Sequence, residues 1–311
     1  MIGKIFRELS VNSADAQRPM VDALLEEAPV MAGLPMMAST HGLFNVYEEL
    51  LETGSAGAVD LDEALPEVAT ESKLQQVDLK VLGAIMTVGE DKAKKYGGAA
   101  KYFANNYGPV LKKTGSDMEK ALVYNTFRAA AIANHSAGDP RLINAGGSGN
   151  ANFSAVAVHY APNEVVGLYD PTGFGNGKVF DISMINDGSL YLDKNGRLVY
   201  GVRLKSYFGV QVANKRYVSA IVNADYASGT PKPVTATMMD SLIENCRGRP
   251  ENTIIYMHPS LLTKLQDLKG GLMQVTERTK DIDRTFISWN GVEIVPTYNM
   301  LRGTEATVAV A

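Results

Sequence analysis

Cysteine is almost absent from this chain, and so are several features that mark familiar classes of protein. Cys246 is the one cysteine among 311 residues, so no disulfide can form within the chain. The first ten residues lack the continuous apolar run of a signal peptide, and no run approaches the roughly 18–20 apolar residues of a membrane span. We therefore expect a protein that is made in a cytoplasm and has no membrane partner.

A strong excess of charge of either sign is lacking as well. The chain has 30 Lys and Arg against 34 Asp and Glu, a net charge of −4, and no block of Lys or Arg. This balance gives no general attraction to nucleic acid, although a locally basic face would not show in the sequence. Hydrophobic residues make up 45% of the chain, which is typical of a folded protein with one large domain or two ordinary ones.

Patterns that carry catalysis or bind metals are also missing. The four histidines are scattered, and none has a second His three or four residues away. Asp60, Asp62 and Glu63 form an acidic cluster, but the glycine of a calcium loop is absent, so a solvated loop is favoured. Residues 173–178 are rich in glycine, yet a strand-like sequence follows where a phosphate loop needs a helix. We expect no catalytic residue, no cofactor and no metal.

What the chain does have is a pair of strand-like runs joined by a long acidic tip. Val77, Leu79 and Val81 alternate with polar residues, and Leu43–Tyr47 forms the outgoing run. The tip between them contains no Lys or Arg, and its acidic residues are Glu52, Asp60, Asp62, Glu63, Glu67 and Glu71. A lone two-stranded hairpin is only marginally stable in water, so we expect this one to lie on a neighbouring copy of the chain.

The other segments predict a mixed α+β fold that is rich in strands in its second half. In the first 38 residues, Leu24 and Leu25 share a helical face that has nothing nearby in sequence to bury it. Ser116–Glu119 has the pattern of a capping box and should begin a long helix that ends before Gly138. Beyond Asn144, strand-like runs separated by turns dominate.

The order of these parts resembles that of the major capsid proteins of tailed bacteriophages, which share the Johnson or Hong-Kong-97-like fold. Residues 253–265, TIIYMHPSLLTKL, are similar to that family's strand, turn and helix, and residues 289–300, WNGVEIVPTYNM, to its late hairpin. Residues 143–160 and 200–225 resemble one subgroup in particular. Because the chain ends eleven residues after Met300, the peripheral strands must come earlier, and the resemblance implies a permuted topology.

The resemblance implies a division of the chain into the parts of a capsid subunit. The expected parts are an N-terminal arm, 1–38; an extended loop, 39–90; a peripheral domain, 91–145 and 199–225, with a spine helix at about 116–135; and an axial domain, 146–198 and 226–311.

The function that this resemblance implies is structural and not enzymatic. Hexamers and pentamers of the chain would form the icosahedral head of a virion that encloses double-stranded DNA without sequence specificity. Assembly would take place in the host cytoplasm, with a scaffolding protein, a portal and, in some relatives, a decoration protein as partners. The residues predicted to make assembly contacts are Asp60, Asp62, Glu63, Glu67, Tyr47, Leu24 and Leu25.

Other functions stay open on the sequence alone. An encapsulin-like compartment shares the fold but encloses protein cargo, and shells that form unaided would favour it. A small cytoplasmic enzyme with Cys246 as nucleophile is a second alternative, although the residues around Cys246 match no protease signature. A decoration or tail-tube protein fits the long helix less well.

Overall fold

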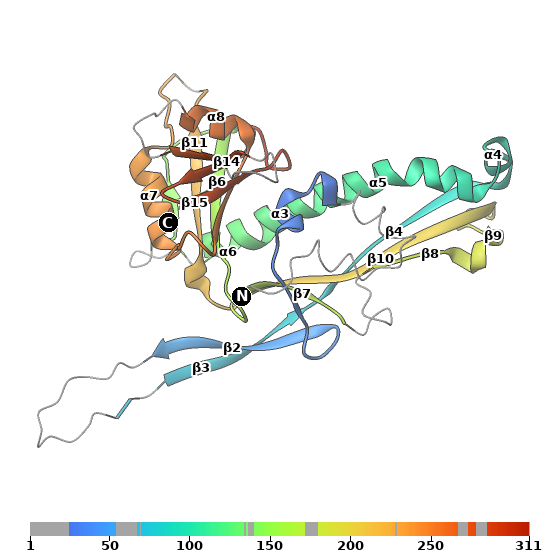
Figure 1. The fold of residues 1–311 in the computed structure, drawn as a ribbon, viewed down its shortest axis with the longest axis horizontal. Helices are drawn as coiled ribbons and strands as arrows, with labels where there is room; N and C mark the ends of the chain where they lie inside the picture. Colours follow the sequence, from blue (N-terminus) through green and yellow to red (C-terminus); the bar gives the residue numbers. More distant parts are fainter. Residues whose placement is uncertain are drawn as a thin grey trace, which may run out of the picture.

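A continuous helix of three segments is the longest element of this computed structural model, which describes residues 25–53, 67–68, 70–133, 135, 140–171, 180–227, 229–266, 273–277 and 285–310. The segments are α5 (Ala99–Ala121), the π-helical η2 (Leu122–Arg128) and α6 (Ala129–Ala133). Two short helices flank it, α3 (Pro29–Ala32) and α4 (Glu90–Lys95). Figure 1 shows the long helix running from a rounded body at one end of the molecule to α4 at the other.

The predicted start of this helix at Ser116 is wrong, because the helix begins at Ala99. Gly108 and Pro109, two residue types that usually interrupt a helix, lie inside it. Proline removes one backbone hydrogen bond there, but the buried face of the helix stays in register across it through Phe103, Tyr107 and Leu111.

A six-stranded sheet lies along the helix. Its long pair is β4 (Lys80–Gly89) and β10 (Leu198–Val212), which run antiparallel from Phe208↔Lys80 to Val199↔Gly89. Three shorter strands pair with β10, namely β7 (Val165–Tyr169), β8 (Phe180–Met184) and β9 (Tyr191–Leu192). The sixth strand, β1 (Met36–Ala38), pairs with β7. Val88, Val202 and Leu204 pack into the core that this sheet shares with α5.

A seven-stranded sheet forms the rounded body. In spatial order its strands are β13 (Met273–Glu277), β14 (Thr285–Trp289), β15 (Val292–Pro296), β12 (Thr253–Met257), β6 (Asn152–His159), β11 (Val218–Asp225) and β5 (Leu142–Asn144). One face packs on α7 (Ala236–Asn245) and α8 (Pro259–Gln266), and the other on the end of the long helix near Phe127. Every residue of β6 and β11 is buried, as expected for central strands covered on both faces.

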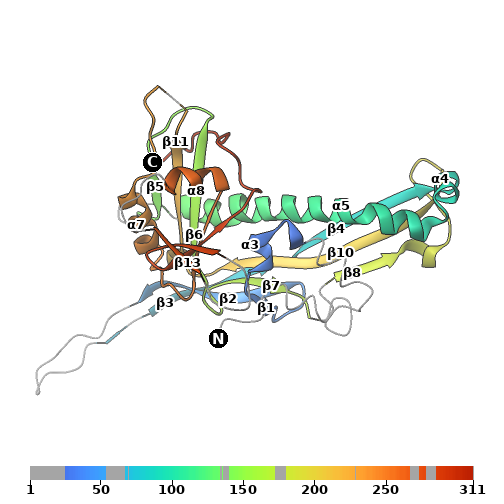
Figure 2. The ribbon, with the colours of Figure 1, turned by 45° about the horizontal axis from the view of Figure 1, so that its top comes forward.

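The predicted hairpin is confirmed. β2 (Phe44–Thr53) pairs antiparallel with β3 (Thr70–Asp78) in a separate two-stranded sheet, and the chain then enters β4. Figures 1 and 2 show this hairpin passing beneath the rounded body and pointing away from the α4 end of the molecule. Asp60, Asp62 and Glu63 in its tip lie outside the described residues.

Strand pairing divides residues 199–225 between the two sheets. β10 lies in the six-stranded sheet, but β11 lies in the seven-stranded sheet, and the 3-10 turn η4 (Lys215–Tyr217) carries the chain between them. β7, β8 and β9 each pair with β10. The burial of the two strands differs accordingly: β10 has exposed positions and β11 has none, as expected for a strand in a doubly covered sheet. The division into peripheral and axial domains and the permuted topology stay predictions.

Two remaining features complete the described structure. The 3-10 turn η3 (Ile185–Gly188) follows β8. None of the helices within the described part of the chain is long and apolar enough to cross a membrane.

Candidate interaction surface

A groove of about 980 Å³ opens where the hairpin leaves the rest of the molecule. One wall is the outgoing strand of the hairpin, residues 45–49. The other wall is the connection between β10 and β11, residues 211–216, together with Arg141 and Arg247. The groove thus lies between three segments that are far apart in the sequence, and the local pattern of none of them predicts it.

The base of the hairpin is fixed to the body by polar contacts in this groove. Asn45 Nδ2 donates to Gln211 Oε1 at 2.5 Å, and Lys215 Nζ lies 2.7 Å from Glu49 Oε1. Gln75 on the returning strand donates to the second oxygen of Glu49 at 3.0 Å. The hydrogen bond from Lys215 holds the pKa of Glu49 below its usual value, against the opposite effect of burial. Glu49 is therefore an ionised anchor at the root of the hairpin.

The body side of the groove has a basic rim, which we define as Lys215, Arg216, Arg247 and Arg249. All four residues are exposed to solvent. Lys215 pairs with Glu49, while within the described ranges no ion pair joins Arg216, Arg247 or Arg249 to a carboxylate. Burial and the neighbouring Glu164 raise the pKa of the Tyr217 hydroxyl. Arg247 and Arg249 lie near this hydroxyl and oppose the rise. A chain with a net charge of −4 thus gathers four cations beside a groove whose lining also includes Glu48, Glu49 and Glu164.

The predicted contact residues fall in different environments. Tyr47 lines the groove, and partial burial, with Glu49 second, raises its pKa. Glu67 is exposed. Leu25 is only 5% exposed and packs in the main core, so its own chain already buries most of its side chain; a contact of Leu25 with a neighbouring copy stays a prediction. Leu24, like Asp60, Asp62 and Glu63, lies outside the described residues.

Sequence reasoning missed the role of Glu119, which was predicted to be half of a capping box. Its side chain is fully buried, and Oε2 accepts the backbone N–H of Val30 at 2.7 Å and of Met31 at 3.3 Å. Oε1 accepts the Thr297 hydroxyl and, at 2.9 Å, Asn299 Nδ2. Burial raises the pKa of Glu119, and these four hydrogen bonds oppose the rise. One carboxylate thereby joins the arm, the long helix and the turn after β15.

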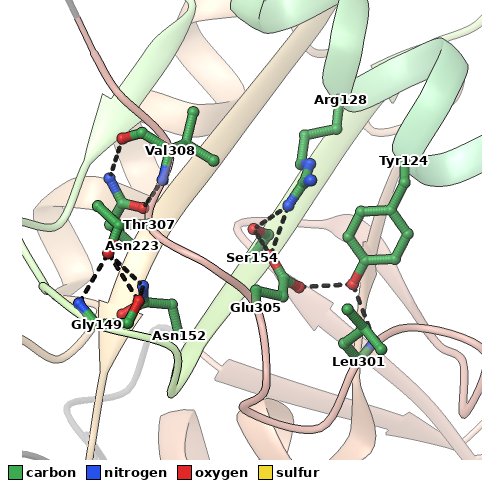
Figure 3. A network of polar contacts seen from close by, with 10 residues as sticks. All are labelled: Tyr124, Arg128, Gly149, Asn152, Ser154, Asn223, Leu301, Glu305, Thr307 and Val308. Carbon is green, nitrogen blue, oxygen red and sulfur yellow. Dashed lines mark hydrogen bonds and ion pairs between the residues drawn. The ribbon is translucent and has the colours of Figure 1, made fainter.

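A second buried carboxylate, Glu305, holds the C-terminal segment against the long helix (Figure 3). Arg128 Nη1 lies 2.6 Å from Glu305 Oε2, and the Tyr124 hydroxyl donates to Oε1 at 2.6 Å. The Ser154 hydroxyl also donates to Glu305, and Tyr124 in turn accepts the N–H of Leu301 at 2.9 Å. Since Arg128 compensates the buried charge, this network fixes residues 301–305 in one path.

The same segment is held further along by amide pairing with the seven-stranded sheet. Val308 N–H donates to Asn223 Oδ1 at 2.8 Å, and Asn223 Nδ2 donates to the Val308 carbonyl at 2.9 Å, as Figure 3 shows. Gly149 N–H donates to the Thr307 hydroxyl at 2.8 Å. The C-terminal residues therefore act as a strap across the body, and short polar residues spread over the sequence gave no signal of it.

The residues considered for catalysis are built into the core. Cys246 is buried, and desolvation raises the pKa of its thiol to about 12, so it is not a reactive thiolate. Burial also lowers the pKa of His258, whose Nδ1 accepts the N–H of Ser260 at 3.0 Å in a turn at the start of α8. Over the described part of the chain, no group of three or more His, Cys, Asp or Glu could hold a metal ion. Cys246 therefore gives the enzyme alternative no support.

The fold and these surfaces define a structural protein: the two sheets, the long helix and the strap are fixed by internal contacts, and a hairpin and a charged groove are left at the surface. The model of the family described as major capsid protein GP7 matches residues 124–309, more than half of the chain. The chain belongs to this family of major capsid proteins. The predicted α+β fold of a capsid protein is confirmed.

Solved structures with a similar course of the chain include capsids and a compartment. Bacteriophage Epsilon15 gives 17% identity and a TM-score of 0.49, over 88% of this chain and 87% of that one. The bacteriophage JBD30 capsid gives 12% and 0.49, over 85% and 88%. The SrpI encapsulin of Synechococcus elongatus gives 10% and 0.42, over 65% and 89%. No curated protein matches the chain. The assignment rests on the family model.

Proposed function

We propose that this chain is the major capsid protein of a bacteriophage and that its hexamers and pentamers form an icosahedral head around double-stranded DNA. Membership of the major capsid protein family carries the proposal. In the same proposal, residues 39–90 are the extended loop, α5 to α6 the spine helix, the six-stranded sheet the peripheral domain and the seven-stranded sheet the axial domain.

The projecting hairpin supports assembly through a neighbouring copy. Beyond its base it is a two-stranded sheet by itself, and Leu74 on β3 is 73% exposed. A lone hairpin is marginally stable in water, so a second surface would stabilise it. Each contact can be weak, because many copies in a closed shell make every contact effectively intramolecular.

The partners in this proposal follow from the class of protein. A scaffolding protein would guide the size of the shell, a portal would occupy one vertex, and a decoration protein would bind outside in some members. Packaged DNA would be enclosed without sequence-specific contacts, in keeping with the lack of any Lys or Arg block. The subunits would assemble in the host cytoplasm and end in the virion.

Electron microscopy of the purified protein tests the proposal. Expressed with the genes that neighbour its own, the chain should form closed shells with hexameric and pentameric capsomers. Shells that form without any other phage protein and enclose a host-encoded enzyme would favour the encapsulin alternative. A discrete small oligomer under every condition would contradict both.

A further inference from the structure

We propose that the basic rim of one copy binds the acidic hairpin segment of a second copy, residues 52–72. This inference rests on the proposed self-assembly and adds the place where the hairpin docks. Lys215, Arg216 and Arg247 of the rim line the groove, and Lys215 and Arg216 belong to η4, which joins the six-stranded and seven-stranded sheets. We assign residues 52–72 to this site because their charge is opposite to that of the rim.

The rim and the hairpin segment carry charges of opposite sign. The rim carries four cations within two short segments, 215–216 and 247–249, and three of them have no ion-pair partner among the described residues. The hairpin segment contains six carboxylates and no cation. Like charges gathered on one surface repel each other, so each cluster is stabilised when the opposite cluster covers it.

The structure already contains one pair of this kind. Lys215 of the rim holds Glu49, an acidic residue of β2, at 2.7 Å. Glu49 is buried and ionised in this contact, while Lys215 stays half exposed. The rim therefore accepts a hairpin carboxylate in this geometry, and Arg216 and Arg247 line the same groove beside it.

Within the described part of the hairpin, no ion pair joins Glu67 or Glu71 to the rim of the same copy. Thr53 and Thr70 pair four and three residues beyond the Glu49↔Lys73 pair, toward the tip. Four residues of extended strand span about 13 Å. Glu67 precedes Thr70 and so comes further along the chain from the Lys215–Glu49 contact. Glu67 and Glu71 are therefore available to the next copy.

A contact of rim to hairpin joins two different surfaces, so it is heterologous. Heterologous contacts continue from copy to copy and close into a ring when the rotation between copies allows it. Docking at the rim therefore gives each subunit one donor and one acceptor surface, which is what a ring-shaped capsomer requires.

Disulfide trapping between two different variants tests the contact directly. One chain carries Glu67→Cys and the other Arg216→Cys, and both are mixed before assembly and oxidised afterwards. A disulfide between these two positions can then form only between copies, and Cys246 is buried in both. We expect a dimer on a non-reducing gel from the mixture and none from either variant by itself. The matched control replaces Arg216→Cys by Lys113→Cys, an exposed cation on α5, and should give no dimer.

Charge exchange provides the second readout. The double variant Arg216→Glu and Arg247→Glu should lower the yield of shells by roughly tenfold or more, because it places like charges opposite each other. Adding Glu67→Lys and Glu71→Lys should restore most of the yield. The control pair Lys94→Glu and Lys113→Glu makes the same change of charge on α4 and α5 and should assemble normally.

Normal shells without the cross-link, or a rim variant that assembles like the wild type, would overturn the inference while leaving the capsid proposal in place. Failure of the exchanged variant to regain yield would overturn the assignment of residues 52–72 as the occupant. Failure of the wild type to form shells with its gene neighbours would overturn the proposed function and this inference together.

Discussion

Glu119 shows how one side chain determines the path of three segments. Its carboxylate lies in the core without a described cation beside it, and four donors from the arm, Thr297 and Asn299 surround it. Burial of a charged group is costly, whereas hydrogen bonds to the ionised form reduce that cost. Desolvation is the larger effect, so the folded protein binds the proton of Glu119 more strongly than the unfolded chain does.

This difference predicts a dependence of stability on pH. Since folding raises the pKa of Glu119, its favourable contribution is complete below the ordinary value of 4.5 and is lost as the pH rises through the raised pKa. Glu119→Gln carries no such proton. We expect the free energy of unfolding of the wild type to fall relative to that of Glu119→Gln as the pH rises above about 4.5. Urea unfolding of the unassembled subunit at a series of pH values measures it, and parallel curves would contradict it.

Glu119→Ala is the stronger change at the same position. It leaves the buried N–H groups of Val30 and Met31 and the Thr297 hydroxyl without their acceptor. We expect a loss of about 2–4 kcal/mol in the free energy of unfolding, larger than that of Glu119→Gln, at any one pH. A loss no greater than that of Glu119→Gln would show that the hydrogen bonds of the carboxylate add nothing.

At the scale of the element, the long helix contains two residues that weaken helices. Gly108 and Pro109 lie in its interior, although both residue types weaken a helix at such a position. The helix continues because one of its faces is buried against the arm and the six-stranded sheet, and tertiary packing outweighs local propensity. The helix is therefore less stable than its length suggests, and one substitution should improve it.

Gly108→Ala should stabilise the protein by less than about 1 kcal/mol, because alanine loses less backbone freedom in a helix but its Cβ crowds the ring of Pro109. Apart from its two chain neighbours, a Cβ at Gly108 meets nothing within 4 Å. Gly147→Ala is the matched comparison: its Cβ would lie 2.5 Å from the Asn223 carbonyl oxygen, so it should destabilise the protein. Denaturant unfolding of the two variants should give shifts of opposite sign, and equal shifts would contradict this account of Gly108.

At the scale of the whole molecule, the hairpin and the body have opposite electrostatic character. Among the described residues, no ion pair joins Glu67 or Glu71 of the acidic segment to the body, while the base is fixed by Asn45 and Glu49. The tip should therefore matter to assembly and not to the folding of the subunit.

Neutralising the tip tests this division. The combined variant Asp60→Asn, Asp62→Asn, Glu63→Gln and Glu67→Gln should fold like the wild type and lose shell yield. High salt screens exposed charges, so it should also lower the shell yield of the wild type. At high salt, the wild type and the neutralised variant should therefore give similar yields. Circular dichroism checks the fold, and electron microscopy with light scattering checks the shells. Normal shells at low salt would count against the prediction.

As a control, four substitutions far from the hairpin, Glu90→Gln, Asp91→Asn, Asp117→Asn and Asp187→Asn, should assemble normally.

Sequence patterns located the hairpin and missed the groove beside it, and the reason is the range of the signal. The alternation of Val77, Leu79 and Val81 is a local property, so it survives without knowledge of the fold. The basic rim joins residues 215–216 with residues 247–249, which no local period relates. The apolar pattern around Leu25 could not tell which chain buries this side chain, because the pattern is the same whether its own chain or a neighbour does so, and the structure shows its own chain burying most of it.

By itself, the sequence determined the α+β class, the existence of the hairpin and the likeness to capsid proteins, since these depend on periodicity and on motifs of adjacent residues. The tertiary structure decided which sheet receives β11, where the long helix begins, and which carboxylates are buried at Glu119 and Glu305. These features depend on burial and charge between segments far apart in the chain. Contacts of that kind form only when the fold brings the segments together.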